Sequence, residues 1–154
     1  MIDTFKEDII IGEEAEYEIL SIIRKKYSKA YKMEGKFKPY DIYVPENDIK
    51  VEVKKDIGSK ETPNYFIEYE CNNEDSGIAS TEANYWVICD EDKCMWIKIS
   101  KLLSLVHLYG KTWQGIPNGG VSKVKAYLLP KEHLISHADK ITKPHESSNW
   151  YYKS

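Results

Sequence analysis

The stretch KPYDIYVPENDIKVEVK, residues 38–54, predicts two β-strands joined by a turn. Residues 40–44 and 49–54 are rich in β-branched and aromatic side chains, as strands usually are. Between them, Pro45-Glu46-Asn47-Asp48 has the composition of a turn. We therefore expect a hairpin centred on Glu46 and Asn47.

The alternation of side chains along this hairpin separates charged from apolar residues. The apolar side chains of both strands share one face, which leaves Asp41, Glu52 and Lys54 on the other. In the expected register Asp41 faces Glu52, and two opposed carboxylates destabilise a sheet by about 0.2–1 kcal/mol unless something neutralises them. Mg²⁺ would do so, with Mn²⁺ as a substitute, because hard cations prefer oxygen ligands. The alternative is a surface hairpin with an ordinary pattern of Glu and Lys.

These side chains suit the hydrolysis of a phosphodiester. Asp41 and Glu52 would hold the metal ion, helped by the backbone carbonyl of Val53, and the ion would offset the charge that builds on the phosphate. Lys54 would orient or deprotonate the attacking water.

The same residues resemble a known signature. Lys38-Pro39-Tyr40-Asp41, followed after ten residues by Glu52-Val53-Lys54, is similar to the motif of the PD-(D/E)XK nuclease superfamily, which includes restriction enzymes and Holliday-junction resolvases. Tyr40 is inserted between the proline and the aspartate of the usual pair. The resemblance implies a metal-dependent deoxyribonuclease of the α/β class, with a restriction-endonuclease-like core in which helices flank a central mixed sheet.

A second match lies upstream. Gly12-Glu13-Glu14-Ala15-Glu16 resembles the segment in which many members carry a glutamate on the first helix, and it points to Glu16 as a catalytic residue. Apolar residues three, four and seven positions later place Glu16 beside the buried stripe of a helix. Acids are rarely buried without a partner. The alternative is a boundary Glu paired with a Lys.

Other residues are candidates for contact with DNA. The loop containing Ser76-Gly77 resembles the substrate loop of resolvase-type phage nucleases, and a strand over residues 121–129 would place two lysines on one face, where they could bind phosphates or be solvated. Glu68 or Glu70 could join the metal site or be charges on an edge strand. The expected nucleic-acid-binding residues are Lys55, Ser76, Lys123 and Lys125.

The remaining pattern predicts one domain over residues 1–154, with a core at about 9–129 and a C-terminal helix and tail at 130–154. Its order is helix, run of strands, helix, strand, helix, with a glycine-rich loop at 111–120. The expected helices are 13–32, 100–109 (capped by Ser100) and 131–141; the expected strands are 40–44, 49–54, 65–71, 85–89, 95–99 and 121–129.

Composition limits the function classes. The chain has 154 residues, 42% of them hydrophobic, and lacks both a membrane-length apolar run and an export signal. Three cysteines argue against a disulfide scaffold, and Gly58-Ser59-Lys60 lacks the upstream glycine of a P-loop. We therefore expect a cytoplasmic protein with no membrane partner and no nucleotide cofactor. The resemblance to phage nucleases makes a bacterium or a phage-infected cell the expected setting.

Charge is segregated along the chain. Residues 24–40 carry a net charge of +6 and residues 93–154 of +7, whereas residues 41–92 carry −10. The basic blocks could hold a polyanion or form solvated faces.

The function expected from these observations is that of a Mg²⁺-dependent DNA endonuclease. The resemblance to small resolvases implies that it is selective for branched DNA such as a four-way Holliday junction. Because a resolvase cuts two strands symmetrically, a homodimer is also expected. The alternatives are a sequence-specific homing or restriction-type endonuclease, and a non-catalytic nucleic-acid- or protein-binding module on the same fold.

Overall fold

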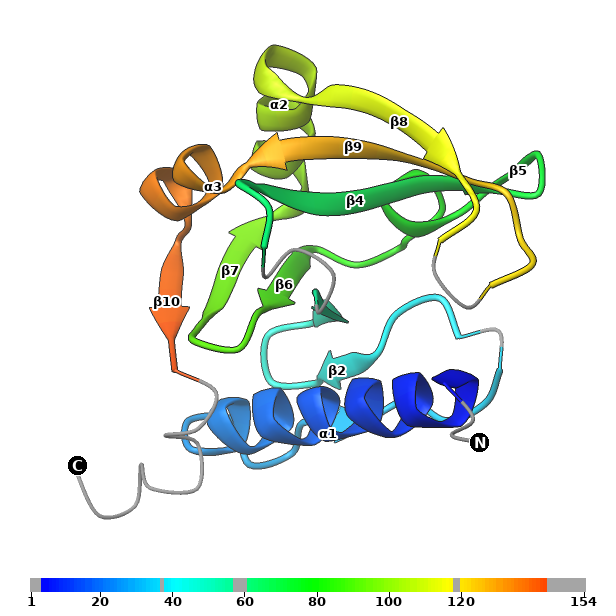
Figure 1. The fold of residues 1–154 in the computed structure, drawn as a ribbon. Helices are drawn as coiled ribbons and strands as arrows, with labels where there is room; N and C mark the ends of the chain where they lie inside the picture. The colour runs from blue at the N-terminus through cyan, green and yellow to red at the C-terminus, as the bar shows by residue number, and fades with distance from the viewer. Residues whose placement is uncertain (1–3, 37, 57–60, 118–119, 144–154) are drawn as a thin grey trace.

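The protein is a mixed α/β structure in which two β-sheets pack together (Figure 1). The computed structural model describes residues 4–36, 38–56, 61–117 and 120–143, and Gly58-Ser59-Lys60 and the tail from residue 144 lie outside these ranges. The elements are α1 (Thr4–Arg24), β1 (Tyr31–Lys32), β2 (Ile42–Val44), β3 (Ile49–Lys55), β4 (Asn64–Cys71), β5 (Glu74–Asp75), a 3₁₀ turn η1 (Gly77–Ala79), β6 (Tyr85–Cys89), β7 (Cys94–Lys98), α2 (Ile99–Tyr109), β8 (Lys111–Gly115), β9 (Val124–Pro130), α3 (Lys131–His137) and β10 (Lys140–Thr142).

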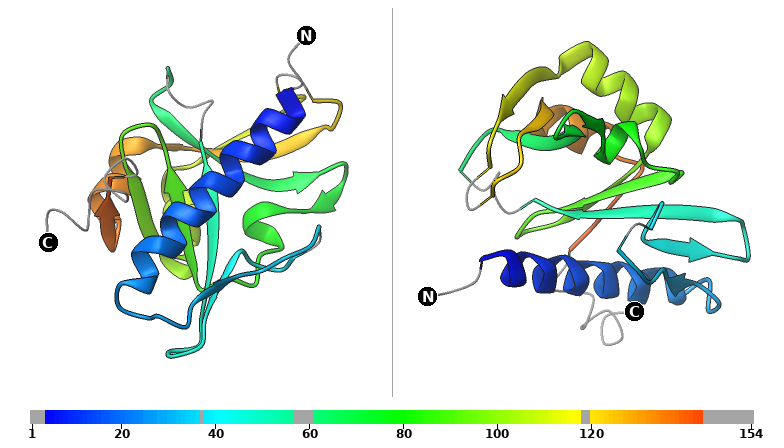
Figure 2. Two further views of the ribbon diagram at one scale, coloured as in Figure 1. Left: turned by 90° about the horizontal axis from the view of Figure 1, so that it is seen from below. Right: turned by 90° about the vertical axis from the view of Figure 1, so that its right-hand side faces the viewer.

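The larger sheet has the strand order β1-β2-β3-β6-β7-β10. The central pair, β3 and β6, is parallel, and the other pairs are antiparallel. The smaller sheet has the order β5-β4-β9-β8 and is antiparallel throughout. Figure 2 shows α1 across one face of the larger sheet, with the smaller sheet and α2 on the opposite side.

Each face of the larger sheet is covered by its own apolar core. Ile19 of α1 packs with Val51, Val53 and Val87 in the first core, because an amphipathic helix buries its apolar stripe. In the second core, Trp86 of β6 packs with α2 and with the smaller sheet. β3 contributes Val51 and Val53 to the first core, and its opposite face, which carries Glu52 and Lys54, is only partly covered.

The expected hairpin is confirmed in register, although its first strand is shorter than the expected 40–44 and begins at Ile42. Val44 pairs with Ile49, and Ile42 pairs with Val51. The expected first helix is misplaced: α1 begins before Gly12, which lies inside it, and ends at Arg24, where residues 13–32 were expected. A single glycine costs a helix only about 1 kcal/mol, which burial of the apolar stripe can outweigh. Residues 31–32 are instead strand β1, paired with β2.

The C-terminal half departs further from expectation. The expected loop at 111–120 contains strand β8, and the expected helix at 131–141 ends at His137 and is followed by strand β10. Lys98, rather than Ser100, is at the N-cap position of α2, and its side chain makes no capping hydrogen bond. These short strands are stabilised by pairing with β9 and β7, so the information that makes them strands lies elsewhere in the chain.

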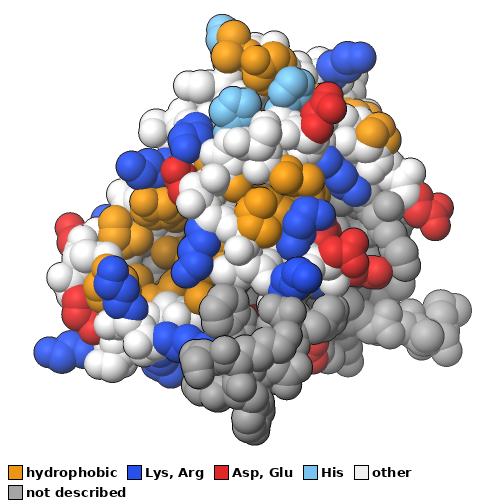
Figure 3. Space-filling view, turned by 90° about the vertical axis from the view of Figure 1, so that its left-hand side faces the viewer, with side chains coloured by type: hydrophobic (Ala, Val, Ile, Leu, Met, Phe, Trp, Pro, Cys, Tyr) orange, Lys and Arg blue, Asp and Glu red, His pale blue; other side chains and the backbone are white. Residues whose placement is uncertain are grey.

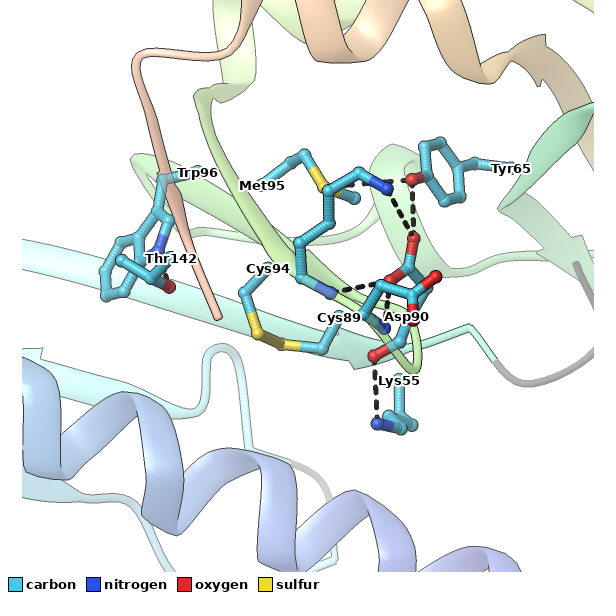
Figure 4. The surroundings of a disulfide bond; sticks show 10 residues. Lys55, Tyr65, Cys89, Asp90, Cys94, Met95, Trp96 and Thr142 are labelled. Atoms are coloured by element: carbon cyan, nitrogen blue, oxygen red, sulfur yellow. Dashed lines mark hydrogen bonds and ion pairs between the residues drawn. A yellow bond between two sulfur atoms is a disulfide. The ribbon is translucent and has the colours of Figure 1, made fainter. Parts of the chain in front are cut away.

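A disulfide joins Cys89 and Cys94, which face each other across the β6–β7 hairpin (Figure 4). The cysteine count argued against a disulfide scaffold, and this single bridge closes only a short turn. Beside it, the Tyr65 hydroxyl donates a hydrogen bond of 2.8 Å to Oδ2 of Asp90. Burial, followed by the Asp90 contact, raises the pKa of Tyr65.

Within the described residues, none of the helices has both the length and the apolar character needed to cross a lipid bilayer.

Candidate active site

Asp41 lies directly before β2, and its carboxylate is bound to the neighbouring strand. The residue is only 5% exposed. Its Oδ2 accepts a hydrogen bond of 2.7 Å from the backbone N–H of Val53, and its Oδ1 lies 3.2 Å from Nζ of Lys38. These contacts hold the carboxylate against β3, beside the position of Glu52.

Glu52 and Lys54 lie on the same face of β3, as the alternation of the strand predicts. Nζ of Lys54 is 3.4 Å from Oε2 of Glu52, and the Thr81 hydroxyl donates a hydrogen bond of 3.2 Å to Oε1. Lys54 also lies over the ring of Trp86, with Nζ 5.5 Å from the ring centroid. Glu52 is thus held on both oxygens, whereas Lys54, 45% exposed, can reach solvent.

The environment of Glu52 favours its protonated form. Burial raises its pKa to about 7; Lys54 lowers it in part, and the adjacent Asp41 carboxylate raises it again. Asp41 raises the pKa of Glu52 because a nearby negative charge disfavours ionisation.

Glu16 reaches the same place from α1. It is 8% exposed, and its Oε1 lies 2.7 Å from Nζ of Lys38 and 3.6 Å from Nζ of Lys32. Burial raises the pKa of Glu16 despite these lysines. Burial alone would lower the pKa of Lys38, but its contacts with Glu16 and Asp41 outweigh this effect and raise it.

The structure therefore brings together the expected catalytic residues Glu16, Asp41, Glu52 and Lys54. We call these four residues, together with Lys32 and Lys38, the carboxylate cluster. The sequence placed Lys32 and Lys38 only in a basic block that could hold a polyanion, and it assigned no role to Thr81. A signal for Lys38 was present, since it stands three residues before Asp41. Lys32 and Thr81 carry no comparable signal, because they reach the cluster only through the fold.

Two of the residues expected to contact DNA face partners within the protein. Nζ of Lys55 donates a hydrogen bond of 3.1 Å to the carbonyl of Asp90 in the β6–β7 turn (Figure 4). Lys125 forms an ion pair of 3.0 Å with Glu70 across the smaller sheet. Glu70 is therefore neutralised away from the carboxylate cluster, and Glu68 shares its strand, β4.

Ser76 and Lys123 are placed differently from those two lysines. Lys123 is exposed, directly before β9. Ser76 carries a buried hydroxyl that has no hydrogen-bond partner among the described residues. It precedes Gly77, whose φ of +50° and close approach to the backbone carbonyl of Glu68 leave no room for a Cβ. The turn is therefore pressed against β4, between the smaller sheet and Thr81.

The basic residues of the C-terminal part are spread among apolar ones. On the side of β10 and α3, lysine side chains are interspersed with hydrophobic side chains (Figure 3). Nζ of Lys140 lies 5.5 Å from the ring centroid of Trp96, and Nζ of Lys131 lies 5.4 Å from that of Tyr65. The stems of these lysines cover aromatic surface. Some lysines of the basic C-terminal block therefore have a packing role within the protein.

No family model, no curated protein and no solved structure matches this chain. The chemistry of the carboxylate cluster is therefore the basis for assigning a function.

Carboxylate oxygens are the donors that a hard divalent cation prefers. Among the described residues, no group of three or more His, Cys, Asp and Glu side chains is arranged so that it could hold a metal ion. Asp41 and Glu52 nevertheless offer carboxylate oxygens beside the backbone of Val53, and the ammonium group of Lys38 already stands as a cation between Glu16 and Asp41. The position is thus electrostatically suited to positive charge.

The pKa of Glu52 predicts how stability depends on pH when no metal is present. The folded state binds this proton more tightly than the unfolded state, so the stabilisation is complete below the ordinary pKa of 4.5 and is lost as pH rises through about 7. Glu52→Gln cannot ionise. Between about pH 5 and pH 8, its free energy of unfolding should therefore fall by about 1 to 3 kcal/mol less than that of the wild type.

Urea denaturation in a chelating buffer measures this difference. Glu82→Gln, the same change at an exposed position, should show the same dependence of the free energy of unfolding on pH as the wild type. The same pH dependence in Glu52→Gln and in the wild type would contradict the prediction.

Proposed function

We propose that the protein is a Mg²⁺-dependent DNA endonuclease with a restriction-endonuclease-like core of the PD-(D/E)XK type. The observation that carries the proposal is the carboxylate cluster: Glu16 from α1, Asp41 from the start of β2, and Glu52 with Lys54 from β3 meet in one place. The mixed sheet, with α1 covering the face that contains Val53, is consistent with such a core.

Each residue has a role in this proposal. Asp41, Glu52 and the carbonyl of Val53 would hold Mg²⁺, and Glu16 would complete or orient that site. When bound, Mg²⁺ supplies Lewis-acid polarisation of a phosphoryl oxygen and a more acidic water molecule. Lys54 positions the attacking water through its ammonium group, or accepts its proton when neutral, and its half-exposed side chain can approach a phosphate.

Branched DNA is the proposed substrate, and a homodimer the proposed active form, because symmetric cleavage of a four-way junction needs two sites. The substrate choice rests on the resemblance of the signature to that of small resolvases. Association would weaken as salt concentration rises, since phosphate contacts release counterions. A sequence-specific homing or restriction-type activity is the nearest alternative within the same chemistry.

Cleavage of an end-labelled four-way junction, compared with linear duplexes that contain the same arm sequences, tests this proposal. We expect Mg²⁺-dependent cuts in the junction, no cuts in the duplexes and no cuts in the presence of a chelator. Cleavage of one linear sequence without junction cleavage would support the homing or restriction alternative.

A non-catalytic binding module is favoured by one observation. Each acid of the carboxylate cluster has a lysine within 4 Å, so the cluster is neutral without a metal when its three acids are ionised. Such a module would bind DNA with no turnover on any DNA form, with or without Mg²⁺ or Mn²⁺.

A further inference from the structure

Lys38 occupies the centre of the carboxylate cluster. Its Nζ lies 2.7 Å from Oε1 of Glu16 and 3.2 Å from Oδ1 of Asp41, and its side chain is 20% exposed. The shorter contact lies in the distance range of charge-assisted hydrogen bonds, which are the stronger kind. Lys38 thus bridges an acid of α1 and the acid at the start of β2.

The cluster is balanced in charge when its three acids are ionised. Glu16, Asp41 and Glu52 lie within ion-pair distance of three cations, Lys32, Lys38 and Lys54. A divalent cation added to this set would meet the ammonium of Lys38 at close range, and like charges a few ångströms apart repel strongly in a partly buried site. Positive charge can enter favourably only where positive charge leaves.

Lys38 is the lysine whose departure would free the most ligand capacity. It contacts two carboxylates, whereas Lys32 contacts Glu16 and Lys54 contacts Glu52. Glu16 keeps Lys32 when Lys38 leaves, so only Asp41 needs a new cation. Lys38 also lies outside helices and strands, and its long side chain already reaches solvent, so rotation about its own bonds can release it.

We propose that Lys38 is a built-in counter-ion that occupies the cation position between Glu16 and Asp41, and that a divalent cation binds by displacing its ammonium group. This inference rests on the proposed function, since the displacing cation is the cofactor of the proposed nuclease. The displaced ammonium stays tethered beside the site, where it can pair with a phosphate of the substrate. Lys38 therefore sets the metal affinity of the site.

Mn²⁺ binding to the full chain without DNA tests the inference. The electron paramagnetic resonance signal of free Mn²⁺ measures this binding at about pH 8, where carboxylates ionise. Lys38→Met removes the charge, and Lys38→Gln removes it while keeping a hydrogen-bond donor. Both should lower the dissociation constant for Mn²⁺ by about tenfold or more. Lys36→Met removes an exposed lysine two residues away and should change it by less than about twofold.

Circular dichroism establishes which variants are folded. If Lys38→Met does not fold, the Mn²⁺ affinity of Lys38→Gln decides the test. An independent readout uses the wild type: the side-chain nuclear magnetic resonance signal of Lys38 should shift on titration with Mg²⁺ and saturate with binding. Unchanged or weaker Mn²⁺ affinity in a folded Lys38 variant, or a Lys38 signal that Mg²⁺ does not move, would overturn the inference.

The outcomes separate this inference from the proposed function. Tighter Mn²⁺ binding in the Lys38 variants, with no cleavage of any DNA by the wild type, would support the counter-ion role and count against the nuclease. DNA cleavage by the wild type with no gain in affinity in the variants would do the reverse. If neither the wild type nor the Lys38 variants bind Mn²⁺, and the wild type cleaves no DNA, both are wrong.

Discussion

Asp41→Asn is expected to reduce Mg²⁺-dependent DNA cleavage by about a thousandfold or more and to leave the fold intact. The amide oxygen of Asn can still accept the backbone hydrogen bond from Val53 that anchors the side chain. The substitution removes the negative charge that would hold the metal ion. Lys38 keeps Glu16 as its partner, so no cation is left unpaired in the cluster.

Single-turnover cleavage of the labelled junction measures this effect, with Asp48→Asn as the matched control. Asp48 lies in the turn of the same hairpin and accepts a hydrogen bond from the Tyr43 hydroxyl. Its φ of 52° is one that asparagine adopts readily, so the control substitution should fold normally. A wild-type rate for Asp41→Asn, or an equal loss in Asp48→Asn, would remove Asp41 from the metal site.

Lys54→Met is expected to lower the cleavage rate by about 10² to 10⁴-fold, the usual contribution of a positioned acid or base. The methionine retains most of the apolar stem that packs over Trp86, so the local structure should persist. DNA binding should weaken only slightly, because one exposed lysine is one phosphate contact among several.

Lys50→Met is the matched control for this variant. Lys50 lies on the same face of β3 as Lys54, with Nζ 5.5 Å from the ring centroid of Tyr40. The Lys50→Met variant should retain a cleavage rate within about threefold of the wild type, because a lost phosphate contact affects binding more than the chemical step. If Lys54→Met cleaves as fast as Lys50→Met while binding the same DNA, Lys54 has no part in the chemistry.

The hairpin that carries these residues was predictable because its determinants are local. A turn composition at residues 45–48 sets the register, and the period-two pattern sets the faces, so Asp41 and Glu52 could be paired from the sequence. The buried position of Glu16 was predictable for a similar reason, since the apolar residues that follow it define the buried side of α1. Its ion pairs with Lys38 and Lys32 are those of the alternative, a glutamate paired with lysine.

The parts that were wrong depend on distant segments. β8 and β10 are short strands whose own residues resemble a loop and a helix, and they pair with β9 and β7. One mixed sheet was expected, whereas the strands divide between two, because β4 pairs with β9 instead of joining β3. Pattern along the chain indicates that a segment is extended, but not which strand lies beside it.

The expected DNA contacts show the same limit for side chains. Nothing in the sequence around Lys55 and Lys125 distinguishes them from other lysines. Only the fold shows that Lys55 donates a hydrogen bond to the carbonyl of Asp90 and that Lys125 forms an ion pair with Glu70. Lys38 is the converse case, since its neighbourhood in sequence suggests a surface and the fold turns it inward between two acids.

The connectivity of β3 also bears on the order in which the cluster assembles during folding. Asp41 and Glu52 share one hairpin, so they can meet at the speed of a short loop closure. The Trp86 platform beneath Lys54 arrives only when β6 pairs in parallel with β3, and that pairing must wait for the long intervening chain to be placed. The two carboxylates would then approach each other before the rest of the cluster is built, and a nearby lysine such as Lys38 would relieve their repulsion at that early stage.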